Sequence, residues 1–387
     1  MLNIDWFQPY NSTTYSIGVI YSVIANLPRE IRFKRENMLI LGILPGPNEP
    51  SLHEINHYLS PIVDELQTLW NGIMLDSTAE NREGKIIRAA LVLVSCDVPA
   101  ARKVCGHISA LVSCHRCIKK ANYINNQHNF GGMENMDEWF VPKSSAIHRQ
   151  NAEEWRNCNS KAARKHFVNN HGARWSELLR LPYFDPIRHL VVDPMHCLFL
   201  GIGKWLVKRI WIDEGIITNN SLNEIQESIE RFQVPSDLGR IPGKVNSGEG
   251  FSNFTADQWR NFFAVYAIVV LWKYLPDTDR QILIHFVKIC QILVCRIVRR
   301  DLLSEAHERL IKMIKLIERK YGPEKISPNL HLSLHLYECV NDYGPLYAFW
   351  CFSFERMNGI LGKLIISRII YEWQKLVTFD NQIIIDF

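Results

Sequence analysis

The sequence predicts an α/β protein whose strands gather in the first hundred residues and whose remainder is mainly helical. Three β-branched or aliphatic runs, separated by polar stretches, are typical of strands: LNIDWF, YSIGVIYSVIANL and NMLILGILP. Between residues 52 and 69 the apolar positions keep helical spacing. The run IIRAALVLVSC is apolar on both faces, so we predict a fourth, central strand that ends just before Asp97.

Strand signals become sparse after this run. Residues 129–149 are polar and glycine-bearing, which indicates a loop, and residues 221–232 form a short amphipathic pattern. A capping-box pattern at residues 255–258 predicts the start of a helix, and further helices are expected from Asp277 and from Ser304. A last amphipathic segment covers residues 350–364.

Composition limits the class of protein. With 387 residues and 47% hydrophobic content, the chain can bury a large core and should hold two or more structural units. No apolar run approaches the roughly 18 residues of a membrane span, and the first residues do not have the pattern of a secretory signal. Ten cysteines in such a chain favour a reducing compartment, and hence free thiols or metal ligands.

Positive charge is uneven although the net charge is only +4. Between Ala101 and Lys120 there is no acid, and a second basic cluster follows in the middle third of the chain. Such clusters suit a polyanion, but solvated helix faces explain them equally well. The first cluster consists of Arg102, Lys103, Arg116, Lys119 and Lys120, and the second of Arg156, Lys161, Arg164, Lys165 and Arg174.

Three acidic residues stand in unusual surroundings. Asp5 lies within the first predicted strand, Asp97 follows the fourth, and Glu355 sits in an aromatic-rich helical stretch. Carboxylates on neighbouring strands can hold Mg²⁺, which prefers oxygen ligands. The alternatives are ordinary ones, because an aspartate after a strand often caps a helix and an acid among apolar residues often pairs with a base.

Cysteine and histidine spacing indicates a metal site. Cys114 and Cys117 can grip one tetrahedral metal from a tight turn, and they supply half of a structural zinc site. His331 and His335, four residues apart, could supply the other half from one helical face, or they could be a buried structural pair. A redox role for the cysteine pair is less favoured, because no thioredoxin-like pattern precedes it.

Two further histidine patterns remain open. The stretch HEINH at residues 53–57 formally matches the zinc-protease motif, but Pro50 and Pro61 leave little room for the helix that this motif needs. His196 is another possible ligand, with Asp193 and Cys197 as possible partners.

Taken together, these motifs resemble a known family. The N-terminal runs quoted above, together with RAALVLVSCDVPAARKVCGHISALVSCHRC, HLVVDPMHCLFLGIGKWL and FSFERMNGILGK, resemble the transposases of CACTA (En/Spm-type) DNA transposons of fungi and plants. The resemblance extends from about residue 2 to residue 363. It implies a ribonuclease-H-like core with an Asp-Asp-Glu (DDE) triad, split by a large helical insertion.

The resemblance assigns roles to the residues. It implies Asp5, Asp97 and Glu355 as catalytic ligands of Mg²⁺ or Mn²⁺, and Cys114, Cys117, His331 and His335 as ligands of Zn²⁺. The basic residues from Arg102 to Lys120 would hold DNA phosphates, and Asp193 and His196 match a D-x-x-H signature of undefined role. The expected activity is DNA strand cleavage and strand transfer.

The resemblance also implies an organisation, a partner and a compartment. The core would comprise residues 1–113 and 331–387, and the zinc-anchored insertion residues 114–330. The partner would be double-stranded DNA, a homo-oligomer is compatible, no membrane is involved, and the compartment would be the nucleus. Only four residues precede Asp5 and the tail after Lys363 departs from the family pattern, so we expect a truncated element. The rival functions are an inactive, zinc-stabilised DNA- or protein-binding remnant and a different metal hydrolase.

Overall fold

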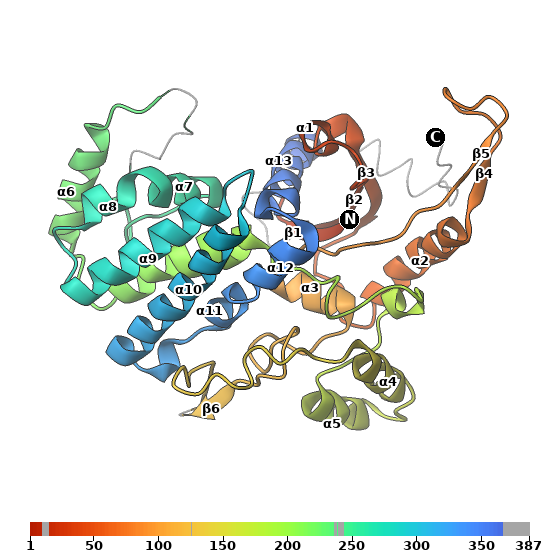
Figure 1. Ribbon diagram of the computed structural model, residues 1–387, viewed down its shortest axis with the longest axis horizontal. Helices are drawn as coiled ribbons and strands as arrows, with labels where there is room; N and C mark the ends of the chain where they lie inside the picture. Colours follow the sequence, from red (N-terminus) through yellow and green to blue (C-terminus); the bar gives the residue numbers. More distant parts are fainter. Residues whose placement is uncertain (10–14, 125, 236–237, 239–243, 367–387) are drawn as a thin grey trace. The chain divides into compact units, whose positions relative to one another are not determined.

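The computed structural model describes residues 1–9, 15–124, 126–235, 238 and 244–366 (Figure 1). It is a mixed α/β structure, about half helical, with small antiparallel sheets. The chain divides into two compact units: residues 1–92 together with the segment from Phe352 onward, and residues Leu93–Cys351. The sequence placed the divisions after residues 113 and 330, and the insertion in a ribonuclease-H-like core stays a prediction. Most of the unusual tail, residues 367–387, lies outside the described residues.

The first unit is built on a three-stranded antiparallel sheet in the order β1-β2-β3. The strands β1 (Leu2–Phe7), β2 (Ile17–Val23) and β3 (Met38–Leu44) are the three that the sequence predicts. Their register sets Asp5 opposite Val19, and it shifts in the β2–β3 pair between Ile20 and Tyr21, where Leu41 is an extra residue in β3. Between β2 and β3 lie the short helices α1 (Arg29–Arg32) and η1 (Arg35–Asn37).

Helix α13 (Phe352–Ile366) packs against β1 and closes the core of this unit. Its Phe354 ring lies 5.7 Å from the Tyr21 ring and 5.8 Å from the Phe33 ring, the latter edge-to-face. Such aromatic contacts add to the burial of the apolar surface. Together with the packing of α13 on β1, these contacts hold the helix against the sheet that carries Asp5.

Helix α2 (Ile55–Asn71) confirms the helical spacing of this region, since Ile55, Leu59 and Val63 form its buried face. Pro61 lies inside the helix, so the expectation that it limits the helix is wrong. Its ring is exposed in the second turn, where a proline removes one backbone hydrogen bond without a clash in the core. The helix is followed by a two-stranded hairpin of β4 (Ile73–Leu75) and β5 (Lys85–Ile87).

The predicted fourth strand is largely wrong. Only its first two residues extend β5, and no strand is described over residues 88–97. Val94 instead makes a single parallel bridge to Leu190, while Leu91, Leu93 and Cys96 are buried. Apolar character predicts burial, but a strand also needs a neighbouring strand along its length, which sequence alone does not reveal.

The second unit is mainly helical, as the sequence predicts for this part of the chain. Helix α3 (Val98–Cys105) opens it, and a two-stranded ribbon of β6 (Asn122–Ile124) and β7 (Gln127–Asn129) follows. The later elements are α4 (Ser145–Arg156), α5 (Lys161–His171), η2 (Glu177–Arg180), η3 (Met195–Gly203), η4 (Leu206–Ile212), α6 (Asn219–Glu230), α7 (Ala256–Asn261), η5 (Phe262–Tyr266), α8 (Ala267–Leu271), α9 (Asp277–Leu293), α10 (Arg300–Tyr321), η6 (Pro323–Lys325), α11 (Pro328–Ser333), α12 (Leu336–Tyr343) and η7 (Leu346–Ala348).

Helix starts that were predicted from local sequence patterns are found in this unit. Thr255 and Gln258 form the predicted capping box at the start of α7, and α9 begins at Asp277 as predicted. The segments η3, η4 and η5 are π-helical, a form that is rare and often found at functional sites. Within the described residues, no helix combines the length and the apolar character that a membrane crossing requires.

Candidate metal centre

Cys114 and Cys117 lie in a tight turn that directs both sulfurs toward the same buried point. The backbone N–H of Cys114 donates to the Lys119 carbonyl over 3.1 Å, and the N–H of Arg116 donates to Cys114 Sγ over 3.3 Å. Lys143 closes the turn from outside, because its Nζ donates to the Cys114 carbonyl over 2.6 Å. An N–H group aimed at a sulfur stabilises the thiolate form, which is the form that binds metal.

The two histidines come from the other end of this unit, but not from one continuous helix. His331 lies in α11, and His335 lies in the turn between α11 and α12. The serine cap of α11, Ser327, and the turn after Ser333 bring the imidazoles together, with ring centroids 5.2 Å apart.

The four side chains fit a tetrahedral zinc ion. All four are at most 1% exposed, and their ligand atoms all lie within 4.8 Å of one another. The Cys117 Sγ to His331 Nε2 distance is 3.3 Å. Bonds of about 2.3 Å to sulfur and 2.0 Å to nitrogen at tetrahedral angles give ligand–ligand separations of about 3.3–3.8 Å. The buried Cys₂His₂ cluster could therefore hold zinc.

The orientation of His335 supports this fit. Its Nδ1 lies 3.1 Å from Glu338 Oε1, and Glu338 Oε2 accepts from Arg116 Nε over 2.9 Å. The opposite nitrogen, Nε2, is buried and has no hydrogen-bond partner. A carboxylate that holds one imidazole nitrogen and leaves the other facing the cluster is the usual arrangement around a zinc-bound histidine.

Electrostatics within the cluster stabilise a negative charge on Cys114. Burial alone raises the pKa of the Cys114 thiol, but the hydrogen bond from Cys117 and the charges of His335 and His331 lower this pKa well below its ordinary value. Burial lowers the pKa of His335, yet Cys114 and Glu338 outweigh it and raise that pKa to about 9. The hydrogen bond with Cys114 and burial raise the pKa of the Cys117 thiol, so the negative charge lies on Cys114. A metal ion at this site would displace the protons of Cys117 and His335.

In the first unit, Asp5 and Glu355 lie on adjacent elements. Asp5 is 8% exposed, its Oδ1 accepts the Trp6 N–H over 2.9 Å, and its Oδ2 accepts Asn358 Nδ2 over 2.7 Å. Asn358 in turn accepts from Tyr21 Oη over 2.6 Å. Glu355 lies one helical turn before Asn358 on α13 and is exposed.

The environment of Tyr21 indicates that both carboxylates are near this hydroxyl. Burial raises the Tyr21 pKa, and the charges of Asp5 and Glu355 raise it further. Tyr21 therefore stays protonated and acts as a hydrogen-bond donor to Asn358. The two successive hydrogen bonds, from Tyr21 to Asn358 and from Asn358 to Asp5, hold the Asp5 carboxylate in one orientation.

Asp97 belongs to the second unit and begins α3. Its Oδ1 accepts the Ala100 N–H over 2.7 Å, so it is the N-cap of this helix, followed by Pro99 in the first turn. This is the capping alternative that an aspartate before a helix offers. A carboxylate retains further lone pairs after one such bond, so capping does not exclude a metal.

Two of the five predicted phosphate contacts do not face solvent. Arg102 and Arg116 are 3% and 4% exposed. The guanidinium of Arg102 donates to the carbonyls of Ile108 and Ser113, each over 2.7 Å, and that of Arg116 binds Glu338. Sequence reasoning missed this role because it read both arginines as surface charge.

The remaining three predicted phosphate contacts lie at or near the surface. Lys120 is exposed, and Lys103 and Lys119 are half-buried. The Lys119 ammonium also lies 5.6 Å from the centre of the Trp139 ring.

Asp193 and His196 form a second cluster with Cys351, in which three ligand-type atoms lie within 4.8 Å of one another. Asp193 Oδ2 accepts the His196 N–H over 2.8 Å and lies 2.7 Å from His196 Nδ1. Its Oδ1 accepts the Cys351 N–H over 2.8 Å. The carboxylate thus organises the start of η3 and positions the histidine. Cys197, the other suggested partner, is buried and donates to the Asn329 carbonyl over 3.3 Å.

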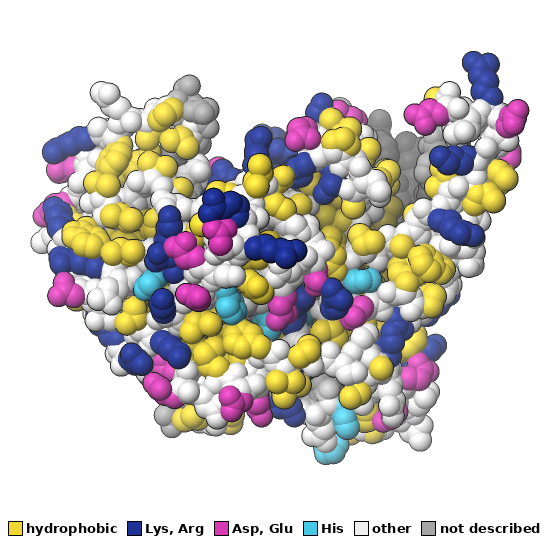
Figure 2. Space-filling model, in the orientation of Figure 1, with side chains coloured by type: hydrophobic (Ala, Val, Ile, Leu, Met, Phe, Trp, Pro, Cys, Tyr) yellow, Lys and Arg dark blue, Asp and Glu magenta, His cyan; other side chains and the backbone are white. Residues whose placement is uncertain are grey.

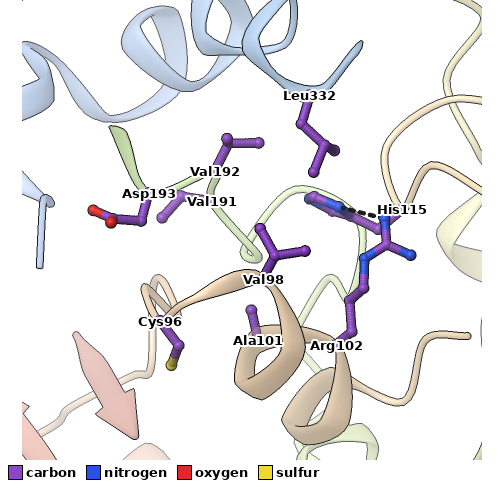
Figure 3. Close-up of a pocket in the computed structure, with 9 residues that line it drawn as sticks. All are labelled: Cys96, Val98, Ala101, Arg102, His115, Val191, Val192, Asp193 and Leu332. Carbon is purple, nitrogen blue, oxygen red and sulfur yellow. Dashed lines mark hydrogen bonds between the residues drawn. The ribbon is translucent and has the colours of Figure 1, made fainter. Parts of the chain in front are cut away.

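A small cavity lies beside Asp193 (Figure 3). Arg102 and His115 meet at one side of it, with 3.5 Å between Nη2 and Nδ1, while the carboxylate of Asp193 points away. Its volume is about 10 Å³, which is about the room of one water molecule. It is too small for a substrate, so the chemistry must be sought at the side-chain clusters.

Some residues of these sites were not predicted from the sequence. Glu338, Asn358 and Cys351 act through partners that are distant along the chain. Glu338 alone had a local cue, since it lies three residues after His335. The HEINH histidines, in contrast, form no group of metal-type ligands within the described part of the chain.

Comparison with known proteins gives one family. Residues 1–169 match the family described as Transposase family tnp2, which is the CACTA/En-Spm transposase family, and this confirms the resemblance stated from the sequence. The match includes Asp5, Asp97, Cys114 and Cys117, whereas the histidine pair and Glu355 lie beyond it. No curated protein matches the chain.

Proposed function

We propose that the chain, whose residues 1–169 match the transposase family tnp2, is the catalytic region of a DDE-type transposase that cleaves and joins DNA at transposon ends. The observation that carries the proposal is the arrangement in the first unit, where α13 brings Glu355 beside the strand of Asp5. These two elements are separated by more than 340 residues of sequence, yet they pack directly on each other. A ribonuclease-H-like core would require such a return of the chain.

The carboxylates suit a divalent cation. Asp5, Asp97 and Glu355 supply oxygen ligands, which Mg²⁺ and Mn²⁺ prefer, and Asp5 is already held in one orientation by Asn358. A bound Mg²⁺ would supply the Lewis acidity that phosphodiester cleavage needs. In the protein, the Tyr21–Asn358 pair restricts the Asp5 side chain, and α13 presents Glu355 from its first turn.

The zinc cluster has a different part in this proposal. Cys117 and His331 are 214 residues apart in sequence, so a zinc ion would close a long loop within the second unit. Closing a loop of this length removes much chain entropy from the unfolded state. The zinc would stabilise the fold, whereas the carboxylates would do the chemistry.

The partner would be double-stranded DNA and the compartment the nucleus, as for transposases that act on chromosomes. Affinity would come mainly from lysines and arginines that neutralise phosphates, without sequence readout. Lys103, Lys119 and Lys120 are the remaining candidates from the first basic cluster.

A nicking assay tests the proposal. Supercoiled plasmid is incubated with the protein and Mn²⁺, and Asp5→Asn and Glu355→Gln should reduce nicking to the level of Mn²⁺ alone. Asp97 needs two variants, because Asp97→Asn keeps a side-chain oxygen for the Ala100 N–H while Asp97→Ala removes the cap. Loss of nicking in Asp97→Asn with an unchanged melting temperature would assign the carboxylate to chemistry.

A control and an alternative complete the test. Glu54→Gln changes an exposed acid at the start of α2 and should leave nicking unchanged. Nicking that survives Asp5→Asn and Glu355→Gln would refute the triad. The second candidate, a zinc-stabilised DNA-binding protein without catalysis, is favoured by the capping role of Asp97. It predicts DNA binding but no nicking by the unaltered protein.

A further inference from the structure

Helix α5 is unusual because none of its eleven residues is buried. A helix in a folded domain normally hides an apolar stripe, but α5 contributes only half-buried residues such as Phe167 and Val168 to its contact with α4 (Figure 1). The helix is nevertheless well terminated, by the Ser160 N-cap and by Gly172 at φ 72°. The local sequence therefore builds a regular helix and leaves most of its surface to the solvent.

The charge of this region has one sign. From Trp155 to Ser176 there are five lysines and arginines and no aspartate or glutamate. Elsewhere in the second unit cations lie among acids: on the face shown in Figure 2, Lys and Arg alternate with Asp and Glu over α9 and α10, as in the Arg309–Glu305 pair. Arg156, at the end of α4, lies 3.8 Å from a Glu153 carboxylate oxygen, but the lysines and the arginine of α5 have no such partner among the described residues.

Two arginines, Arg156 at the end of α4 and Arg164 in α5, lie against aromatic rings. The Arg164 guanidinium lies 5.1 Å from the centre of the Trp155 ring and donates to the Arg156 carbonyl over 3.0 Å. Trp155 Nε1 donates in return to the Arg164 carbonyl over 3.1 Å. The Arg156 guanidinium lies 4.3 Å from the centre of the Trp175 ring. The contacts between Trp155 and Arg164 join α4 to α5, and the contact between Arg156 and Trp175 joins the end of α4 to the segment after α5.

The exposed positions of α5 carry side chains that suit contact with a nucleic-acid phosphate backbone. Lys161 and Lys165 are exposed one turn apart, so their ammonium groups lie on one face of the helix. Ala162 and Asn169 are also exposed on this side. A small residue allows close approach of a groove, and asparagine can donate to phosphate oxygens.

We propose that the exposed face of α5 binds the phosphate backbone of double-stranded DNA, with Lys161 and Lys165 as its principal contacts. This inference rests on the proposed function and adds to it a binding surface outside the region of the three carboxylates. An unneutralised basic helix attracts a polyanion over a long range and releases condensed counterions when the polyanion binds. The contacts read charge and spacing rather than base sequence.

The test measures binding to a 40-base-pair duplex by fluorescence anisotropy at several salt concentrations. Lys161→Gln/Lys165→Gln should weaken binding roughly 10- to 100-fold at about 100 mM salt, and it should reduce the log–log salt slope by about 2, since each phosphate contact contributes about 0.9. The effect should be the same for duplexes of different sequence. The melting temperature and zinc content should not change, because neither lysine is buried.

The matched control is Lys288→Gln/Lys312→Gln, which removes the same charge from exposed positions of α9 and α10. It should bind like the unaltered protein. If the α5 variant also binds unchanged while the unaltered protein binds DNA, the α5 surface is refuted and the proposed function stands. If both double variants weaken binding equally, only net charge matters and the surface is again refuted.

Two further outcomes are decisive. If the unaltered protein binds no duplex at low salt, the proposed function and this surface both fail. If the loss appears only with duplex RNA of the same sequence, the surface recognises a different polyanion, and the inference about DNA is overturned.

Discussion

Among its described residues, the second unit contains two clusters of metal-type side chains, and these differ in what their ligand atoms already bind. In the Cys₂His₂ cluster, His335 Nε2 is buried without a hydrogen-bond partner and faces the thiols. In the Asp193–His196–Cys351 cluster, the carboxylate oxygens already accept the Cys351 and His196 backbone N–H groups and hold the His196 ring. In both clusters the ligand-type atoms lie within 4.8 Å of one another. The carboxylate oxygens of the second cluster are hydrogen-bonded within the cluster, whereas His335 Nε2 of the first has no hydrogen-bond partner.

The comparison teaches that proximity alone does not make a metal site. A buried polar atom without a partner is costly, so an orphaned imidazole nitrogen is an argument for a ligand. The Asp193 carboxylate already accepts three hydrogen bonds, so its charge is stabilised without a metal ion. We therefore expect zinc at the first cluster and a structural role for the second.

Removing one zinc ligand should have the largest effect. Cys117→Ser should lose the one equivalent of zinc that we expect in the purified protein. It should lower the free energy of unfolding by about 5 kcal/mol or more, since structural zinc contributes about 10–16 kcal/mol of binding free energy in small sites. Metal analysis by mass spectrometry and thermal unfolding measure the two quantities. Cys158→Ser, at a half-buried cysteine outside the cluster, should change neither. Full zinc content in Cys117→Ser would remove this residue from the ligand set.

Removing the carboxylate of the second cluster should cost less and leave zinc in place. Asp193→Ala deletes a helix cap and leaves the buried Cys351 N–H without this acceptor. The expected loss is about 2–4 kcal/mol, combining about 1 kcal/mol for the cap with 1–3 kcal/mol for the buried donor. Asp193→Asn keeps an acceptor oxygen and should lose less. A fall in bound metal with either variant would show that this cluster holds an ion, against our interpretation.

The orientation of His335 should have a smaller effect that is specific to the metal. Glu338→Ala removes the carboxylate that holds Nδ1, and zinc affinity should fall about 10- to 100-fold, as is typical for groups behind a metal-bound histidine. Competition with a chromophoric chelator measures this affinity. Glu338→Gln retains an acceptor and should recover part of it, while Glu324→Ala, an exposed acid without a histidine contact, should leave it unchanged. Equal affinity in Glu338→Ala and the unaltered protein would separate Glu338 from the site.

How far the sequence predicts this molecule depends on whether a signal is local. The capping box at Thr255 and Gln258, the start of α9 at Asp277 and the cysteine turn are defined by neighbours in sequence, and the structure contains each of them. The strand expected before Asp97 is absent over most of its length, because a strand needs a partner that no local pattern identifies.

The same limit applies to charge and to the site. Arg116 looked like a surface cation, but its partner Glu338 lies 222 residues further along the chain. The histidine pair was found from spacing alone, although the helix expected to carry it is broken into two. The resemblance supplied the pairing of cysteines with histidines, which neither spacing nor composition could establish.

A buried histidine outside both clusters gives the smallest expected effect and extends the comparison. His148 on α4 is 5% exposed, its ring centroid lies 4.4 Å from that of His107, and Lys143, Arg149 and Asp185 act on it electrostatically. Burial lowers its pKa to about 3, with the charges of Lys143 and Arg149 adding to this effect and Asp185 opposing it. No metal-type group within the described residues includes His148, so protonation, rather than metal loss, is its response to acid.

The sign of this response follows from the folded-state pKa being lower than the unfolded one. The native state keeps His148 neutral, so its contribution to stability is complete above pH 6.5 and is lost as the pH falls toward 3. Between pH 7.5 and 6.0 the loss should be about 0.8 kcal/mol, given an unfolded pKa of about 6.5. We expect His148→Gln to weaken the pH dependence of the unfolding free energy by this amount, measured by urea titration with zinc present. Ile147→Gln, at an exposed position beside it on α4, should keep the full dependence. Identical pH dependence in His148→Gln and the unaltered protein would mean that His148 has the same pKa in the folded and unfolded states, and that burial does not keep it neutral.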